Sequence, residues 1–249
     1  MPYPIAAVRE RNFFQAVATL TYAEKVLATE PSNLLAYFIC GEASGTVMQE
    51  EKNNYDGAYT GVTLGQTGIG DGNTCPLFDG ANDYGNLYTA GLAGVFNGAE
   101  GTMAVWCKMN TAGVWTDSTQ RYLYRLAADT SNRADITKQA TTNQLRFRYT
   151  AGGTEELVTD TSLAGTANWF HLAMTWSVAA DQVIAYINGA QVGATQTGLG
   201  TWAGALASTS TVIGAQNTTP SAAHYGYLAH AAEWSTPLNS TQIADLATV

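Results

Sequence analysis

Residues 168–176 read NWFHLAMTW, and residues 183–189 read VIAYING. In the first run the large apolar side chains from Phe170 to Trp176 recur at every second position, the period at which strand residues share one face. The second run ends in Asn188-Gly189, a pair typical of the two-residue turn of a β-hairpin. We therefore expect a buried strand, followed by a second strand that turns back on itself at residues 188–189.

The same period of two runs through residues 102–109, 144–150, 211–216 and 225–234, with glycine-rich and Asn- or Asp-rich turns between the runs. No helix long enough for a parallel crossover is expected between these runs, which leaves antiparallel pairing. The sequence thus predicts an all-β protein, an antiparallel two-sheet jelly-roll sandwich.

Short helices are expected near both ends of the sandwich. Thr21 precedes residues 22–28 and has Glu24 three positions on, the spacing of a capping box. Asn239 and Gln242 repeat that spacing before a last apolar turn that ends near Leu246. We expect a short helix at each place.

Composition limits the function classes. The 249 residues carry a net charge of −9, and only 12% of them are charged. Few Lys and Arg are available to neutralise phosphates, so nucleic acid is not expected as a partner. No apolar run is long enough to span a bilayer, no basic and apolar leader follows Met1, and Cys40, Cys75 and Cys107 have the spacing of neither a disulfide framework nor a zinc site. We expect a folded protein without membrane insertion and with cysteines that act as small buried apolar groups.

Several segments, in order, resemble the laminin-G-like branch of the concanavalin A-like lectin/glucanase sandwiches. The quoted runs are similar to the centre of that family, and five further segments resemble its other strands and its terminal helical turn: residues 36–38 with 41–45, 77–84, 212–214, 225–234 and 237–239. The resemblance covers nearly everything from Leu34 to Val249 and implies the jelly-roll fold. It leaves function open, because this sandwich carries lectins, adhesins, glycosidases and passive structural modules.

Three functions are therefore weighed. Such sandwiches generally act outside cells, yet this chain shows no export signal and no partner module. We expect a non-enzymatic structural or binding protein, a virion surface component such as a capsid decoration or tail protein of a phage. The alternative is a carbohydrate-binding adhesin module at an extracellular or cell-surface location, and the third candidate is a glycoside hydrolase.

The carboxylates argue against hydrolysis. Glycosidases on this sandwich resemble one another in a strand of alternating acids, which places a nucleophile and an acid on one face. Glu155-Glu156 is a tight acidic pair, but adjacent strand residues point to opposite faces. We expect this pair to mark a solvated hairpin after Gly152-Gly153, and we expect no catalytic residues and no required cofactor.

Asp71, Asp79 and Asp83 lie in turns between early strands. The family resemblance implies an optional calcium site at the sandwich rim, with these carboxylates as ligands. Ordinary turn chemistry explains the same residues, because Asp and Asn bond their own backbone and Gly supplies positive φ. Both interpretations stay open at the level of sequence.

Aromatic side chains in loops are the candidates for binding cell-surface glycans. Trp115, Trp202 and Tyr225 lie in or beside expected loops, where a ring can stack on the C–H groups of a sugar. Most aromatic residues of a sandwich belong to its core, which is the competing interpretation for each of them.

We expect three segments: an N-terminal arm over residues 1–20, a short helix and linker over 21–33, and the sandwich over 34–249. The arm carries Phe13, Phe14, Val17 and Leu20, whose exposure would cost on the order of 1.5–3 kcal/mol per large side chain relative to burial. Something should cover them. We expect the arm to dock on other subunits of a virion or assembly, and the chain to be an oligomer or part of one; packing of the arm on its own sandwich is the alternative.

Overall fold

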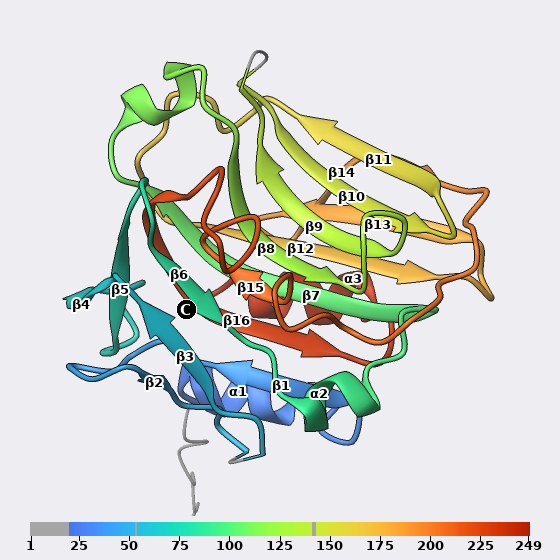
Figure 1. Ribbon diagram of the computed structural model, residues 1–249, viewed down its shortest axis with the longest axis horizontal. Coiled ribbons are helices and arrows are strands. Elements are labelled where there is room, and N and C mark those ends of the chain that lie inside the picture. The colour runs from blue at the N-terminus through green and yellow to red at the C-terminus, as the bar shows by residue number, and fades with distance from the viewer. Residues whose placement is uncertain (1–19, 53, 141–142) are drawn as a thin grey trace, which may run out of the picture.

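The computed structural model describes residues 20–52, 54–140 and 143–249. Within these ranges, two antiparallel sheets of eight strands each stack on one another (Figure 1). The expected jelly-roll sandwich is confirmed, and every strand pairing within the described residues is antiparallel.

Sheet A runs in the order β14-β13-β12-β7-β16-β5-β4, and β1 also pairs with β16. Its strands are β1 (Leu34–Phe38), β4 (Thr63–Thr67), β5 (Thr74–Asp79), β7 (Glu100–Met109), β12 (Phe170–Ser177), β13 (Gln182–Ile187), β14 (Ala190–Gln196) and β16 (Tyr225–Trp234).

Sheet B runs in the order β11-β10-β9-β8-β15-β6-β3-β2. Its strands are β2 (Val47–Met48), β3 (Gly57–Thr60), β6 (Tyr84–Asn86), β8 (Arg121–Ala127), β9 (Arg133–Lys138), β10 (Leu145–Ala151), β11 (Thr154–Asp160) and β15 (Val212–Ile213).

The hairpin expected at residues 188–189 joins β13 to β14. Asn188 has φ 49° and Gly189 φ 82°, the two positive values that this tight turn requires. The Asn188 side chain also accepts a hydrogen bond from the backbone N–H of His171 at 2.9 Å, which ties the turn to the start of β12.

Sheet A has apolar side chains on both faces. Along β7, Met103, Val105, Cys107 and Met109 face the core between the sheets, whereas Ala104 and Trp106 join a second apolar cluster on the outer side. Two helices, α1 (Tyr22–Ala28) and α3 (Ser240–Leu246), contribute their buried residues to that cluster, so they cover part of the outer face of sheet A (Figure 1).

Both expected caps are present. The Thr21 hydroxyl accepts from the N–H of Glu24 while the Glu24 carboxylate accepts from the N–H of Thr21, and Asn239 and Gln242 repeat the reciprocal arrangement at α3. The remaining helices are α2 (Ala90–Val95), whose buried residues join the core between the sheets, and a 3-10 turn, η1 (Ala112–Thr116). No helix in the described part of the chain is long and apolar enough to cross a bilayer.

The three cysteines are free thiols, and they are buried, as the sequence predicted. Of the predicted arm, Phe13, Phe14 and Val17 lie outside the described residues. Leu20 is described and is exposed, with 55% of its surface accessible. The predicted linker segment 21–33 begins with α1, which packs on sheet A.

Candidate functional site

A pocket of about 380 Å³ lies on the outer face of sheet A, between β12–β14 and residues 237–240. Thr175, Ile184 and Tyr186 lie on strands β12 and β13 at its base, and the exposed Gln182 and Gln191 stand at its sides. All twelve lining residues are uncharged at neutral pH.

Strand alternation builds the base of this pocket. In β13 the residues Val183, Ala185 and Ile187 enter the core between the sheets, which turns Gln182, Ile184 and Tyr186 to the outer face. Burial raises the pKa of Tyr186, so its phenol stays a neutral hydrogen-bonding group.

A hydroxyl group in β7 holds the opposite wall in place. The Thr102 hydroxyl donates to the carbonyl of Thr236 at 2.8 Å and accepts from the N–H of Leu238 at 2.8 Å. This fixes the chain just before Asn239, whose side chain caps α3. The wall is therefore positioned without any ligand.

Hydroxyl and amide groups around a partly apolar base suit an uncharged, hydroxyl-rich ligand. Amide side chains both donate and accept, and a sugar hydroxyl can satisfy both. The pocket is missing from the sequence predictions, because its two walls are more than forty positions apart along the chain. The one sequence signal was the period of two that separates Gln182, Ile184 and Tyr186 from the core residues of β13.

The three aromatic residues predicted to stack on glycans differ in their exposure and lie in different places. Trp115 is completely buried, and its indole N–H donates to the carbonyl of Thr166 at 2.7 Å. A ring without exposed surface offers no face to a sugar, so this prediction is wrong. The reason is that η1 folds back and turns the ring of Trp115 toward Phe170, with ring centroids 6.1 Å apart.

Trp202 and Tyr225 are partly exposed and lie in different places. The ring of Trp202 packs beside Phe96 and Tyr149, with centroids 5.6 and 6.0 Å away, so it closes one edge of the core. Tyr225 starts β16, and the guanidinium of Arg121 lies 5.7 Å from its ring centroid. Neither residue lines the pocket on sheet A.

The predicted calcium ligands do not converge. Asp71 precedes β5 and Asp79 is its last residue, so the length of the strand separates them. In the described ranges no three His, Cys, Asp or Glu side chains come together as a metal site. The prediction of one calcium site formed by Asp71, Asp79 and Asp83 is therefore wrong for this part of the chain.

Asp71 instead pairs with a histidine. Its carboxylate lies 3.0 Å from Nε2 of His230, and both side chains are buried. The other ring nitrogen of His230 lies 2.7 Å from the hydroxyl of Tyr37. Burial acts to raise the pKa of Asp71, but hydrogen bonds from His230 and Asn73 hold that pKa well below its usual value. This carboxylate is already engaged by hydrogen-bond donors of the protein.

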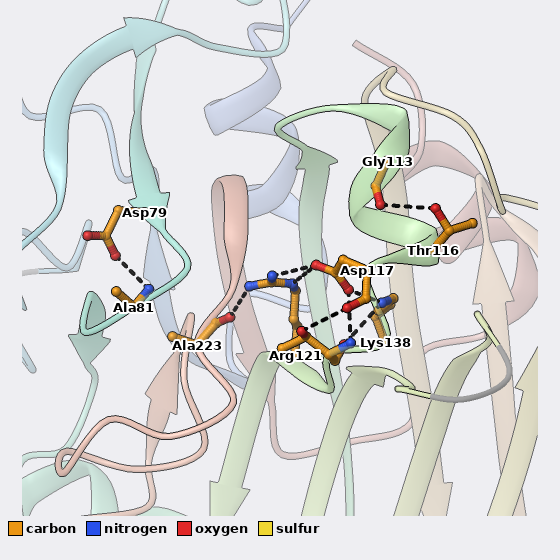
Figure 2. A network of polar contacts seen from close by, with 9 residues as sticks. Asp79, Ala81, Gly113, Thr116, Asp117, Arg121, Lys138 and Ala223 are labelled. Carbon is orange, nitrogen blue, oxygen red and sulfur yellow. Dashed lines mark hydrogen bonds and ion pairs between the residues drawn. The ribbon is translucent and has the colours of Figure 1, made fainter.

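The other two aspartates serve turns. The Asp79 carboxylate accepts from the N–H of Ala81 at 2.8 Å (Figure 2), and the Asp83 carboxylate accepts from the N–H of Asp79 at 2.8 Å. These contacts match the turn chemistry that the sequence left as the alternative to calcium.

Figure 2 also shows Asp117 held between Arg121 and the fully buried Lys138. Lys138 Nζ lies 2.6 Å from the Asp117 carboxylate, and Arg121 additionally donates to the carbonyl of Ala223 at 2.7 Å. Burial acts to raise the pKa of Asp117, but the hydrogen bonds from Lys138 and Arg121 lower it overall. The network fastens η1 and the segment before β16 to sheet B.

Two histidines lie in the interior. Burial lowers the pKa of His171 and of His224 to about 3, so both are neutral at physiological pH. His171 is buried, and its Nδ1 has no hydrogen-bond partner among the described residues.

The fold and the pocket define a lectin-like β-sandwich with a neutral, polar cleft on one sheet. Residues 56–244 match the model of the concanavalin A-like lectin/glucanases superfamily (Laminin_G_3), and the chain belongs to this family. No curated protein matches the chain by sequence.

Solved structures share the sandwich at low identity. Domain 4 of AbnA, a GH43 extracellular arabinanase from Geobacillus stearothermophilus solved with arabinotriose, is similar with a TM-score of 0.62 and 17% identity, over 87% of this chain and 98% of that domain. A Trypanosoma rangeli sialidase in complex with sialic acid has a TM-score of 0.61 and 11% identity, over 87% of this chain.

The receptor-binding domain of botulinum neurotoxin mosaic serotype C/D has a TM-score of 0.65 and 8% identity, over 86% of this chain. The chain spans nearly all of the arabinanase domain, but only 33% of the sialidase and 50% of the neurotoxin domain. At these identities the likeness establishes the shared sandwich.

Proposed function

We propose that this protein is a non-catalytic glycan-binding protein, with the pocket beside α3 as the binding site. The observation that carries the proposal is the chemistry of that pocket. Gln182, Gln191 and Asn239 supply amide groups, Thr175 supplies a hydroxyl, and the partly exposed Ile184 supplies an apolar surface at the base. Such a set can bind sugar hydroxyls and C–H faces, and it contains no acid that could protonate a glycosidic oxygen.

Relatives of the fold support a saccharide as the ligand class. The arabinanase domain that this chain spans almost completely was solved with arabinotriose, and the sialidase was solved with sialic acid. A neutral oligosaccharide fits the uncharged lining best.

The test is to block the pocket and measure binding. A glycan array first identifies a neutral saccharide, and titration calorimetry then compares variants. Ala180→Trp fills the pocket from an exposed turn, and we expect at least a tenfold loss of affinity. Ala179→Trp is the matched control, because Ala179 is exposed on the same turn but does not line the pocket. Gln182→Ala should weaken binding about two- to tenfold, the range for one lost hydrogen bond.

Equal binding by the Ala180→Trp variant and the wild type would place the glycan site elsewhere. The absence of binding to any neutral saccharide on the array would reject the proposed function. In parallel, the same saccharides should release no reducing ends when incubated with the protein; release that a single Asp or Glu substitution abolishes would make it a hydrolase.

We propose further that the protein acts at a virion surface, as a capsid decoration or tail protein. The support is the combination of a lectin-like sandwich with a sparsely charged surface and an apolar N-terminal segment. Immunogold labelling of particles, with an antibody against the purified protein, tests this location. Label that stays with cell-surface material and never with particles would favour the adhesin alternative.

A further inference from the structure

The outer face of sheet B carries arginines in a chain that has few. On β8, β9 and β10, core residues such as Leu126, Ala134 and Phe147 point between the sheets. The alternate positions point outward, and the register sets Arg125 opposite Asp135, which in turn lies opposite Arg148. We call the outward cluster of Tyr122, Arg125, Asp135, Arg146 and Arg148 the arginine face.

No described helix covers this face, because α1 and α3 pack on sheet A and α2 packs into the core. With the neighbouring Arg133 and Glu155, the outward positions of β8–β11 hold four arginines against two carboxylates. The face is therefore locally positive, although the whole chain has a net charge of −9.

Arg148 pairs with the buried carboxylate of Asp135. Its Nε and Nη2 lie 3.1 and 2.9 Å from Asp135, and Nη2 also donates to the hydroxyl of Tyr122 at 3.2 Å. Its Nη1 lies 3.5 Å from Glu155. The two carboxylates of the face are thus both engaged by Arg148, and Glu155 also pairs with Arg133.

Arg125 is left without such a partner. Only 4% of its surface is exposed, yet Nε and Nη1 make no hydrogen bond to any described residue. Its guanidinium lies 5.4 Å from the ring centroid of Tyr122. Burial lowers the pKa of Arg125, because water is largely excluded from the positive charge.

Arg146 also has a buried donor without a hydrogen-bond partner among the described residues, but its side chain lies nearer to solvent. It is partly exposed, and its Nε is buried without a hydrogen-bond partner in the described part of the chain. In the register of the sheet Tyr122 and Arg146 both lie opposite Thr137. Buried charged donors are costly to leave unpaired, and an incoming anion would pair them.

We propose that the arginine face binds the carboxylate of an acidic saccharide through Arg125 and Arg146. A planar guanidinium matches a carboxylate with two parallel hydrogen bonds. Arg146 is the more exposed contact and Arg125 the more buried one. This site is separate from the neutral pocket on sheet A and extends the proposed glycan binding to a charged ligand class.

The experiment compares an oligogalacturonate with a neutral oligogalactan by titration calorimetry. We expect the wild type to bind the oligogalacturonate at least tenfold more tightly. Arg146→Gln should lower that affinity about tenfold, and Arg125→Gln should do the same. Arg133→Gln is the matched control: it removes one positive charge from the same face, but Arg133 already pairs with Glu155, so we expect less than a threefold change.

Several outcomes would overturn the proposal. They are equal affinity for the acidic and neutral saccharides, an equal loss in the Arg133→Gln and Arg146→Gln variants, or displacement of the saccharide by an equal concentration of inorganic sulfate. If the Arg125→Gln variant does not fold, the partly exposed Arg146 still decides the question. The Ala180→Trp variant keeps its acidic-saccharide binding if the two sites are independent, so failure of one proposal is distinguishable from failure of the other.

Discussion

Glu233 places a carboxyl group inside the sandwich. It lies on β16, is completely buried, and has one oxygen 3.2 Å from the hydroxyl of Tyr124 while the other oxygen has no partner among the described residues. Burial raises the pKa of Glu233 to about 8 from a usual value of 4.5. The folded protein therefore keeps a proton on Glu233 that the unfolded chain releases.

This proton makes stability depend on pH. The contribution of the neutral carboxyl is fully present below pH 4.5 and is lost as the pH rises through about 8, by up to about 1.36 kcal/mol per pH unit. Glu233→Gln replaces the titratable carboxyl group by a neutral amide of similar size. We therefore expect the variant to be more stable than the wild type above pH 8. The difference should shrink toward pH 4.5.

Urea denaturation of both proteins across this range measures the effect. The difference between the two proteins is the quantity to follow, because the buried His171 and His224 add an opposite slope below pH 6.5, where the unfolded chain protonates them. A difference that does not change with pH would show that Glu233 is ionised in the folded protein.

At the scale of elements, α1 and α3 are joined through one tyrosine. The indole N–H of Trp106 on β7 donates to the Tyr22 hydroxyl at 2.8 Å, and that hydroxyl donates to the carbonyl of Leu246 at 2.8 Å. Lys25 adds a hydrogen bond to the carbonyl of Thr248 at 2.8 Å. The two helices thus hold each other on the outer face of sheet A, and α3 in turn follows the wall of the neutral pocket.

Tyr22→Phe deletes the shared hydroxyl and leaves the Trp106 N–H buried without its acceptor. We expect a loss of about 1–3 kcal/mol in the free energy of unfolding, measured by chemical denaturation. Tyr88→Phe is the control, because the Tyr88 hydroxyl makes no hydrogen bond to the described residues, and it should change stability by less than about 0.5 kcal/mol. Equal effects of the two substitutions would mean that the junction between the helices contributes nothing.

At the scale of the whole molecule, the predicted arm meets the sandwich at Leu20, next to the Thr21 cap of α1. Deleting residues 2–20 leaves that cap and the buried Tyr22 and Val26 in place. We expect the truncated protein to keep its melting temperature and to lose oligomerisation or attachment, measured by calorimetry and by light scattering after size exclusion.

A longer deletion, of residues 2–28, removes α1 and should lower the melting temperature sharply, because it uncovers the apolar cluster on sheet A. If the shorter deletion already lowers the melting temperature as much and leaves the molecular size unchanged, the arm belongs to its own sandwich. The assembly hypothesis would then lose its main support.

The sequence by itself determined the fold class, the helix caps and the hairpin. These features depend on local physics: side chains alternate along β7 and β13, a hydroxyl reaches an N–H three residues away at Thr21, and Asn188-Gly189 adopts positive φ at low cost. The residues that produce each of these features lie within about ten positions of one another, so the feature is recognisable in the sequence alone. The same patterns could not separate sandwiches that bind from sandwiches that cleave.

Only the tertiary structure decided which side chains meet. The sequence predicted Asp71 as a calcium ligand in a turn, but β16 places His230 against its carboxylate. The sequence predicted Trp115 as a glycan-stacking residue in a loop, but η1 packs its ring against Phe170. The neutral pocket joins β13 to the start of α3, and the arginine face joins three strands through their register. Such contacts depend on strand order and on the stacking of two sheets, and the spacing of residues along the chain contains neither.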